Sequence, residues 1–390
     1  MRIALIAPFA IHPKGTTRWR VLPLARALAD QGHAVRVVIP PYDWPLHSGR
    51  RWQDRGVDVV NVAMPPGQTL PAHLMLAGRL ARAALDWQPD VLHCFKPKGH
   101  SGLAASALLS GRAPLVMDAD DYEAGWNRVL SYPALWASFF QWQERSLLRR
   151  AHAVTAASRW LESFARSLGQ PRVQYLPNGV EFSRSQNAMR RQDDRLTEDR
   201  TNRLRVLLYS RFVEHGAGDV WQVWRQVLAA EPAARLLVAG QGRSGEETLL
   251  AQMAAEAGAG HSVQSLGWLP ANARPGLFAA ADAALLPVQD TMLNRAKSPM
   301  RLLDLLAAGV PVATQRVGEY GVMVVDGVTG LLAAPGDAAG LAGQMIRLLR
   351  AGDLRLHLGQ AAAAAMQAHY AWPQLAQSAL NVYHAALLRY

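Results

Sequence analysis

Residues 285–314 read LLPVQDTMLNRAKSPMRLLDLLAAGVPVAT, and this stretch decides the fold. The apolar run that ends near Pro287 predicts a buried strand, and an irregular polar loop follows it. Ser298 then suits a helix N-cap, Pro299 suits the first helical position, and Gly309 ends the helix before a second buried strand. The pattern places a helix N-terminus at the carboxyl end of a parallel sheet, which is where α/β folds bind ligands.

Two cations flank this helix N-terminus. Without a bound anion, Lys297 and Arg301 would each oppose the helix dipole by about 0.3–1 kcal/mol. Free N–H groups and two cations suit an anion, so we expect an anion site here rather than two solvated cations beside an ordinary cap. Arg211 follows a buried strand at 204–209 and precedes a helix, so we expect it at the same edge of the sheet.

The alternation of strand and helix extends outward from this stretch in both directions. Apolar runs predict strands at 2–7, 34–39, 90–95, 113–119, 151–158, 173–178, 204–209 and 235–240, followed by SVQSLGWL, AALLPV and VPVAT. Residues 183–203 are polar and charged, so they read as a linker or exposed insertion. We therefore expect an α/β protein with two Rossmann-like, doubly wound parallel-sheet domains at 1–180 and 181–371, with a last helix at 372–390 packing back on the first.

Composition limits the class of protein. The chain has 390 residues, 50% of them hydrophobic and 18% charged, which suits two packed domains and not a disordered chain. Cys94 is the only cysteine, so no intramolecular disulfide forms. Met1 begins a strand directly, and no run of about 18 apolar residues predicts a membrane span. We expect a cytoplasmic protein, with peripheral attachment to the inner face of a membrane as an option.

The positive charge is uneven. Residues 1–200 carry 26 Lys+Arg and 17 Asp+Glu, a net of +9, while the remainder carries 15 and 13, a net of +2. An anionic partner such as lipid or a phosphorylated acceptor would explain this, and so would an arginine-rich surface without a partner; we expect no nucleic acid. WNRVLSYPALWASFFQW at 126–142, followed by RSLLRR, suits either weak peripheral binding to an anionic membrane or an amphipathic helix packed under the sheet. We favour the packed helix.

Stretches along nearly the whole chain resemble one family. They are MRIALIAP, RVLPLARALADQGHAVRVV, PDVLHCF, PLVMDADD, AHAVTAASRWLESF, YLPNGVE, RVLLYSRF, ARLLVAGQG, SVQSLGWLP and the block from AADAALLP to LLAAPGD. The sequence resembles glycosyltransferase family 4, the retaining enzymes of the GT-B fold. The resemblance implies two domains that face a cleft, a nucleotide-sugar donor on the second and an acceptor on the first. A hexose or related sugar would be transferred to a glycan, a lipid carrier or a small molecule.

The resemblance also implies roles for residues of the second domain. Arg211 matches the arginine that holds the donor diphosphate, and His215 stands near the place of the usual lysine. Asp304 matches the second of two acids, which binds the ribose hydroxyls, whereas the first acid falls on Ala296. Lys297, beside Ala296, would compensate at the diphosphate, together with the helix N-terminus at Ser298 and Pro299. The base is expected near the turn of Trp268 and Leu269.

In the first domain, the chain departs from the family at the expected catalytic position. The family commonly has a histidine where this chain has Asp120, next to Asp121, and we take these two acids as the catalytic candidates. DADD at 118–121 would suit a divalent metal in the other major glycosyltransferase fold, but we expect metal-independent transfer and no cofactor. The loop around Gly15 lacks G-x-G-x-x-G, so we expect its backbone to approach the donor or acceptor instead.

Two other functions fit the same pattern. A silent homologue that binds a ligand or partner would explain Ala296 and the missing lysine. Another GT-B enzyme, such as a nucleotide-sugar epimerase, would use the same donor site. Donor hydrolysis separates an enzyme from a silent homologue, and product analysis separates transferase from epimerase.

Overall fold

A computed structural model describes residues 1–111, 113–182 and 204–388, so the linker or insertion expected at 183–203 lies outside the described residues. Contacts divide the chain into two compact units. The first unit comprises residues 1–181, 296–298 and 370–390, and the second unit comprises 182–295 and 299–369. The expected boundaries at 180 and 371 lie beside these, but the grouping of 296–298 with the first unit was not anticipated.

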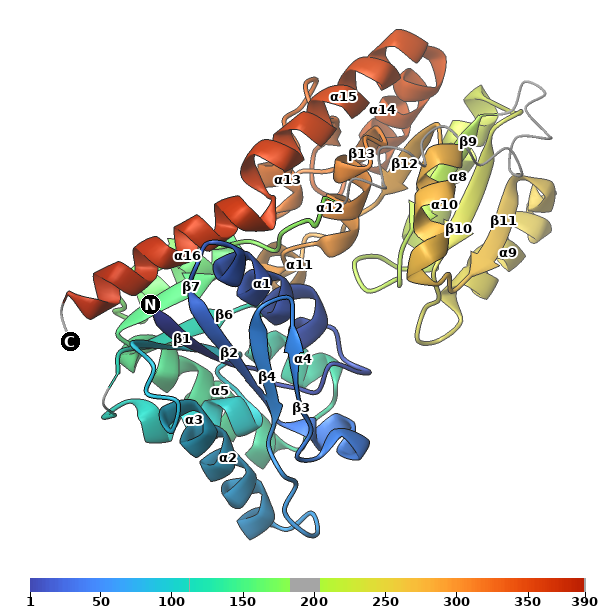
Figure 1. Ribbon diagram of the computed structural model, residues 1–390. Coiled ribbons are helices and arrows are strands. Elements are labelled where there is room, and N and C mark those ends of the chain that lie inside the picture. The colour runs from blue at the N-terminus through green and yellow to red at the C-terminus, as the bar shows by residue number, and fades with distance from the viewer. Residues whose placement is uncertain (112, 183–203, 389–390) are drawn as a thin grey trace. The chain divides into compact units, whose positions relative to one another are not determined.

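The first unit is built on an eight-stranded sheet in the order β3-β4-β2-β1-β5-β6-β7-β8 (Figure 1). The strands are β1 (Arg2–Ile6), β2 (Ala34–Ile39), β3 (Arg51–Asp54), β4 (Val57–Asn61), β5 (Val91–Phe95), β6 (Leu115–Ala119), β7 (Ala153–Ala156) and β8 (Val173–Tyr175). All neighbours pair in parallel except β3 and β4, which form an antiparallel edge hairpin. The sequence analysis found the other six strands of this sheet but missed β3 and also β4, which pairs in parallel with β2.

Helices cover both faces of this sheet. They are α1 (Leu22–Asp30), α2 (Leu70–Leu85), α3 (Gly99–Leu108), α4 (Glu123–Val129), α5 (Ala134–Arg150), α6 (Arg159–Ser167) and α16 (Trp372–Leu387). Successive residues of β1 point to opposite faces, as the pleat of a strand requires. Ile3 and Leu5 pack in the cluster that contains α1 and α16, and Ala4 and Ile6 pack in the cluster that contains α2 and α3. This burial on both faces explains why the strand is apolar throughout.

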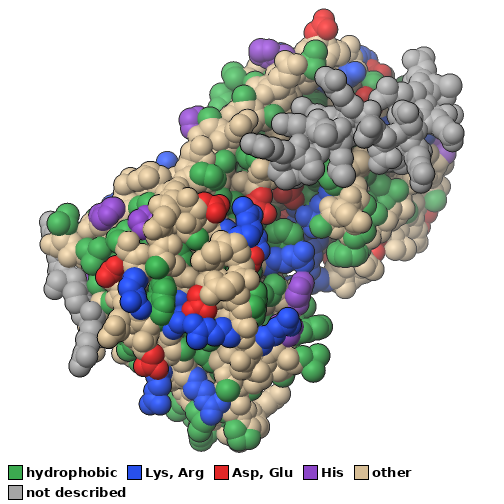
Figure 2. Space-filling view, in the orientation of Figure 1, with side chains coloured by type: hydrophobic (Ala, Val, Ile, Leu, Met, Phe, Trp, Pro, Cys, Tyr) green, Lys and Arg blue, Asp and Glu red, His purple; other side chains and the backbone are tan. Residues whose placement is uncertain are grey.

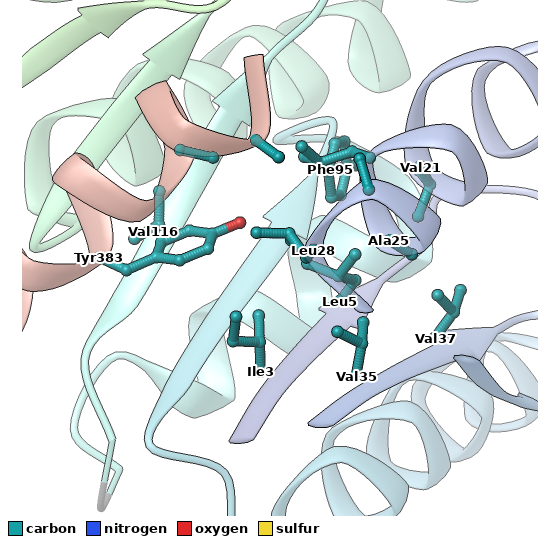
Figure 3. Packing of buried hydrophobic residues seen from close by; sticks show 14 of the residues in the cluster. Ile3, Leu5, Val21, Ala25, Leu28, Val35, Val37, Phe95, Val116 and Tyr383 are labelled. Carbon is teal, nitrogen blue, oxygen red and sulfur yellow. The ribbon is translucent and has the colours of Figure 1, made fainter. Parts of the chain in front are cut away.

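The last helix, α16, packs on the first unit through the apolar stripe of the sequence pattern. Leu375 and Ala379 are buried in the same cluster as β1 and α1. The chain approaches this helix closely at Gly179, where an added Cβ would lie 2.7 Å from Leu375 and 2.8 Å from Trp372. Tyr383 reaches the middle of the cluster (Figure 3), and its hydroxyl lies 2.7 Å from Nδ1 of the buried His93.

The second unit has a six-stranded, wholly parallel sheet in the order β11-β10-β9-β12-β13-β14. Its strands are β9 (Arg205–Tyr209), β10 (Arg235–Ala239), β11 (Val263–Gly267), β12 (Ala283–Leu286), β13 (Val312–Gln315) and β14 (Leu331–Ala333). Its helices are α8 (Ala217–Ala230), α9 (Glu246–Glu256), α10 (Arg274–Ala280), α11 (Met292–Ala296), α12 (Met300–Ala307), α13 (Tyr320–Met323), α14 (Ala338–Arg350) and α15 (Gly352–His369). Val206 and Leu208 of β9 pack in one cluster with residues of α8 and α14. Trp224 of α8 is fully buried in this cluster. Both units are therefore Rossmann-like.

We predict that Tyr383→Phe lowers the free energy of unfolding by about 1–3 kcal/mol, because it leaves Nδ1 of the buried His93 without its partner. Urea denaturation of parent and variant measures the change. Tyr132→Phe, at an exposed ring, is the control. Equal stability of parent and Tyr383→Phe would contradict a hydrogen-bonded anchor for α16.

Candidate functional site

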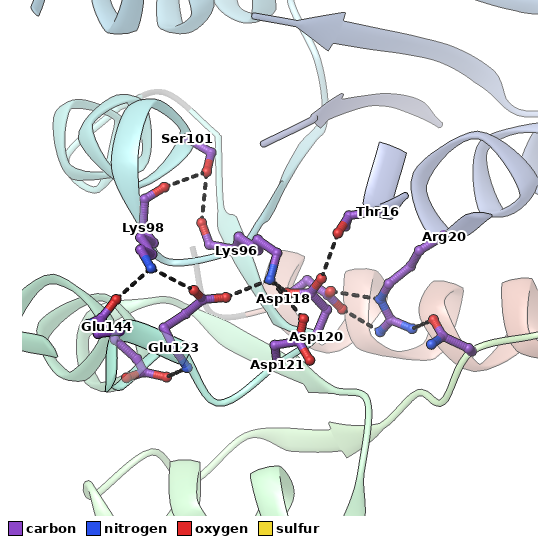
Figure 4. Close-up of polar contacts among 12 residues, drawn as sticks. Thr16, Arg20, Lys96, Lys98, Ser101, Asp118, Asp120, Asp121, Glu123 and Glu144 are labelled. Atoms are coloured by element: carbon purple, nitrogen blue, oxygen red, sulfur yellow. Dashed lines mark hydrogen bonds and ion pairs between the residues drawn. The ribbon is translucent and has the colours of Figure 1, made fainter. Parts of the chain in front are cut away.

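Acidic side chains gather in the first unit where β6 ends (Figure 4). Asp118 and Asp120 come from the end of β6 and the residue after it, Asp121 follows, and Glu123 begins α4. Lys96, directly after β5, lies among them. The carboxyl ends of β5 and β6 lie at one edge because these strands are parallel neighbours, so the fold brings these charges together.

Of the two catalytic candidates, Asp120 has the more deeply buried side chain. Its Oδ2 accepts a hydrogen bond from Thr16 at 3.2 Å, which places the loop of Gly15 beside it. Its Oδ1 lies 3.2 Å from the ammonium of Lys96, but this buried oxygen accepts no hydrogen bond from any described residue. Burial raises the pKa of Asp120 to about 7, against the opposing charge of Lys96. Asp121 is more accessible, with 28% of its side chain exposed.

Asp118 belongs to the core and not to this open edge. Both of its oxygens accept from the guanidinium of Arg20, at 2.8 and 2.7 Å, and Oδ2 also accepts from Thr155 at 2.6 Å. With these bonds made and its side chain fully buried, Asp118 has no oxygen directed at solvent. The sequence pattern DADD therefore mixes one structural acid with two candidate site acids.

Three carboxylates of the cluster could hold a metal ion. Oxygens of Asp120, Asp121 and Glu123 lie within 4.8 Å of one another. The Lys96 ammonium lies among them, 2.6 Å from Glu123 and 3.0 Å from Asp121. The sequence analysis missed Lys96 and Glu123; a lysine directly after a buried strand and before Pro97 was the available signal.

Glu144 of α5 supports the cluster from behind. Its two oxygens accept hydrogen bonds from the backbone N–H groups of Glu123, at 3.0 Å, and Ala124, at 3.3 Å. These are free donors of the first turn of α4, so Glu144 caps that helix from another element. Burial, and next the charge of Glu123, raise the pKa of Glu144 to about 8.

In the second unit, Arg211 stands exposed two residues beyond β9. No described residue makes a hydrogen bond or ion pair with its guanidinium. Burial, and then the like charges of Arg301 and Arg243, lower its pKa, while Glu214 alone opposes them. The loops that carry these arginines touch, because a Cβ on Gly240 would lie 1.7 Å from the carbonyl oxygen of Ser210. The edge thus gathers positive charge around Arg211, with Glu214 as the acid that acts on it.

His215 does not replace the family's lysine as a free cation. It is only 4% exposed, with Nε2 3.0 Å from Ser210 Oγ and Nδ1 3.3 Å from the carbonyl oxygen of Gly216. The Ser210 hydroxyl also accepts from the backbone N–H of Phe212 at 2.9 Å. Burial lowers the pKa of His215, so its imidazole is neutral and orders the loop that presents Arg211.

Asp304 lies in α12 with 23% of its side chain exposed. Among the described residues it forms an ion pair with Arg274 of α10, 3.8 Å away. Burial raises the pKa of Asp304 to about 6, and Arg274 and Arg301 oppose that shift. Arg301 itself lies over the ring of Tyr209, 5.6 Å from its centre. Such a long ion pair leaves Asp304 able to accept further hydrogen bonds.

The turn after β11 lies beside the loops of β9 and β10. Gly267 has a left-handed φ of 63°, and its carbonyl oxygen accepts from the N–H of Gly240 at 2.8 Å. Trp268 is 70% exposed, and Leu269 is half-buried. An exposed indole on this edge offers a flat apolar surface for a nucleobase.

The start of α12 differs from the sequence-based expectation, and so do the roles of Lys297, Ser298 and Pro299. Ser298 is not the N-cap of α12: Pro299 takes that position with an extended ψ of 98°, and the helix starts at Met300. The Ser298 hydroxyl instead accepts from the N–H of Asn178 at 2.9 Å, so a tertiary contact displaces the local cap. Lys297 is 8% exposed in the first unit, with its ammonium 5.5 Å from the centre of the Trp126 ring.

Two Rossmann-like units with polar sites at the carboxyl ends of their strands define a glycosyltransferase of the GT-B fold. The family described as "Glycosyl transferase 4-like domain" matches residues 15–179, and "Glycosyl transferases group 1" matches residues 203–351. The chain belongs to glycosyltransferase family 4. The family and the fold predicted from the sequence are therefore confirmed.

Known proteins resemble the chain over most of its length. Glycogen synthase from Mycobacterium tuberculosis is 26% identical over 400 residues, covering 93% of this chain and 89% of that protein. Phosphatidyl-myo-inositol mannosyltransferase from Mycobacterium leprae is 26% identical over 388 residues, covering 98% and 96%. The solved structure of sucrose-phosphate synthase from Thermosynechococcus elongatus superposes with a TM-score of 0.73 at 18% identity, covering 100% of both chains. At this low identity, the similarity to sucrose-phosphate synthase shows a shared fold.

We predict that Glu144→Gln reduces the loss of stability with rising pH. Between the ordinary pKa of 4.5 and about 8, the unfolded chain releases this proton while the folded protein keeps it, so stability falls as pH rises. In this pH range, one such group lowers the free energy of unfolding by about 1.4 kcal/mol per pH unit. The variant is neutral at every pH and keeps one of the two acceptor oxygens, so it should lose less stability than the parent between pH 6 and pH 8 in urea denaturation.

The exposed Glu256 of α9 provides the control, as Glu256→Gln. Parallel pH profiles for Glu144→Gln and the parent would show that Glu144 is charged in the folded protein.

Proposed function

We propose that the protein transfers a sugar, with retention, from a nucleotide-sugar donor held by the second unit to a glycan or lipid-linked acceptor held by the first. The observation that carries this is Arg211, a guanidinium that forms no ion pair with a described residue and is repelled by Arg301 at the edge where α/β folds bind ligands. A diphosphate would supply the missing negative charge. The two relatives are named for glycogen and for phosphatidyl-myo-inositol, a glycan and a lipid.

The donor nucleotide would extend along the loops after β9, β10 and β11. Arg211 and Arg301 would meet the diphosphate, Asp304 would accept hydrogen bonds from the ribose hydroxyls, and Trp268 would lie against the base. Asp304 fits this role because its ion pair with Arg274, the one it forms among the described residues, is long, and 23% of its side chain is exposed. His215 would act on the donor only through the loop that it orders.

In the first unit, Asp120 and Asp121 would receive hydroxyl groups of the transferred sugar or the acceptor. Asp120 Oδ1 is buried without a hydrogen-bond donor among the described residues, so a substrate hydroxyl would satisfy it. During transfer, the bond from the sugar's anomeric carbon to the diphosphate breaks and the bond to the acceptor oxygen forms. The acceptor proton passes to the leaving diphosphate. Arginines would neutralise the diphosphate, so the step as proposed needs no divalent metal ion and no cofactor.

We predict that Arg211→Ala weakens binding of a nucleoside diphosphate by about 1.5–3 kcal/mol, the scale of a hydrogen bond to a charged group. Calorimetry with a panel of nucleoside diphosphates measures this, and the exposed Arg225 of α8, changed to Ala, is the matched control. Transfer is assayed with the matching nucleotide sugars, by product analysis, with and without a strong chelator.

Unchanged affinity in Arg211→Ala would contradict the donor site. Nucleotide binding without hydrolysis or transfer would favour a silent homologue, and an isomerised donor would favour an epimerase. A complete loss of transfer with chelator, reversed by metal, would contradict the metal-independent step.

We also propose weak peripheral binding of the first unit to anionic membrane through α4 and α5. No described helix is long and apolar enough to cross a bilayer. The aromatic stretch is not packed under the sheet, as we had favoured: Leu135, Trp136 and Trp142 are 80%, 46% and 61% exposed. The helix packs instead through Gln143 to Leu148. Two exposed arginines, Arg149 and Arg150, lie at the C-terminal end of α5 and add positive charge to the surface that Leu135, Trp136 and Trp142 form.

Figure 2 shows basic, acidic and hydrophobic side chains intermingled over one face of the first unit. Exposed aromatic and aliphatic side chains followed by arginines, as on α5, suit an anionic bilayer surface. We predict that the protein sediments with phosphatidylglycerol vesicles at low salt, less at high salt, and not with phosphatidylcholine vesicles. Leu135→Ser combined with Trp136→Ser should abolish sedimentation. Leu356→Ser, at a 62% exposed leucine of the second unit, should not.

Binding that ignores lipid charge and salt, or that survives the double substitution, would contradict this surface.

A further inference from the structure

Lys96 is held in an unusual conformation at the centre of the acidic cluster. Its φ of 61° lies in the left-handed region, which a residue with a Cβ adopts at a cost. Hydrogen bonds hold the turn on both sides: its N–H donates to the carbonyl oxygen of Asp118 at 3.1 Å, and its own carbonyl oxygen accepts from Ser101 Oγ and from the N–H of Lys98, both at 2.8 Å. The tertiary structure thus stabilises an unfavourable backbone conformation that fixes the direction of the Lys96 side chain.

That side chain ends among three carboxylates. The ammonium donates to Glu123 at 2.6 Å and to Asp121 at 3.0 Å, and it lies 3.2 Å from Asp120 Oδ1. Lys96 is 6% exposed, so its charge is little screened by water. Lys98 approaches only Glu123, at 3.3 Å, and otherwise donates to Asn127 (Figure 4).

This arrangement resembles a metal site with the ion replaced by a side chain. Three acidic residues offer oxygens within 4.8 Å of one another, which a divalent cation would ordinarily bind. An ammonium has three N–H groups and can meet three oxygens from one point. Unlike an ion, it is covalently attached and is always present. Its contact with Asp120 lacks hydrogen-bond geometry, so Oδ1 stays available to a further donor.

We propose that Lys96 is a positioning residue that supplies, from within the chain, the positive charge that a divalent metal ion would supply at these carboxylates. It holds Asp121 and Glu123 in place and pairs with Asp120 through Oδ1, an oxygen that accepts no hydrogen bond from a described residue, so that this carboxylate is positioned for a hydroxyl of the sugar or acceptor. The inference rests on the proposed function, in which Asp120 meets the substrate. It adds that the cluster is closed to metal ions as long as Lys96 occupies its centre.

Lys96→Met removes the charge and keeps most of the volume, and Lys96→Arg keeps the charge. Lys98→Met is the matched control, because Lys98 contacts neither Asp120 nor Asp121. Mn²⁺ binding is measured by electron paramagnetic resonance, and transfer kinetics are measured with and without Mn²⁺. We expect the parent and Lys98→Met to bind no Mn²⁺ at the cluster and Lys96→Met to bind one.

Without Mn²⁺, Lys96→Met should lose about a hundredfold in kcat with a smaller change in donor KM, as misplacement of a substrate-contacting group does. Mn²⁺ should restore part of that loss, and Lys96→Arg should retain most of the parent's kcat. A structural role alone predicts neither Mn²⁺ rescue nor a specific loss in kcat.

The proposal is overturned if the parent binds Mn²⁺ and Asp121→Asn abolishes that binding, or if a folded Lys96→Met binds none. Should Lys96→Met fail to fold, the parent's Mn²⁺ titration and the kinetics of Lys96→Arg decide. A parent that transfers no sugar from any donor would contradict the proposed function, whereas the Mn²⁺ measurements would still test the position of Lys96.

Discussion

The buried ion pair between Arg20 and Asp118 is the interaction on which most of the first unit depends. The two side chains are 3% and 0% exposed, and they share two hydrogen bonds. Removing one partner of such a pair costs about 3–5 kcal/mol, because the other charge stays buried. On one side, Asp118 accepts from Thr155, which lies 3.0 Å from His93, and His93 in turn meets Tyr383 of the last helix. A single charge pair therefore connects the loop after β1, the centre of the sheet and α16.

On its other side, Arg20 donates to the carbonyl oxygen of Leu176 and to Asn178 Oδ1, and Asn178 holds Ser298 by its backbone N–H and its side-chain amide. These bonds explain why residues 296–298 belong to the first unit although their neighbours in sequence belong to the second. They also explain the failure of the predicted N-cap, since Asn178 holds both the hydroxyl and the carbonyl oxygen of Ser298, and the helix starts two residues later, at Met300. Local helix signals are outweighed here by a tertiary contact between residues 120 positions apart in the chain.

The sequence predicted what depends on neighbouring residues and missed what depends on distant ones. Most buried parallel strands were found because each is a continuous apolar run. The strands β3 (RWQD) and β4 (VDVVN) were missed because polar residues interrupt them, and β14 was missed because it has three residues. Asp120 and Arg211 were found because they follow buried strands. Lys96 and Glu144 were missed because only the fold places the one among the carboxylates and the other at the start of α4. Exposure of Trp136 also depends on what α5 packs against, which its own sequence leaves open.

Two departures from the family pattern gain an explanation once burial is known. Ala296 is 1% exposed and packs in a core cluster of the first unit, where a carboxylate would be costly without a partner. His215 is buried and neutral, with both ring nitrogens engaged. Both positions are thus structural, and near His215 a positive charge is supplied by Arg211 instead. Burial, and then the like charges of Arg301 and Arg243, lower the pKa of Arg211. A bound anion would offset both effects, so the surroundings of Arg211 favour the proposed donor site over a silent homologue.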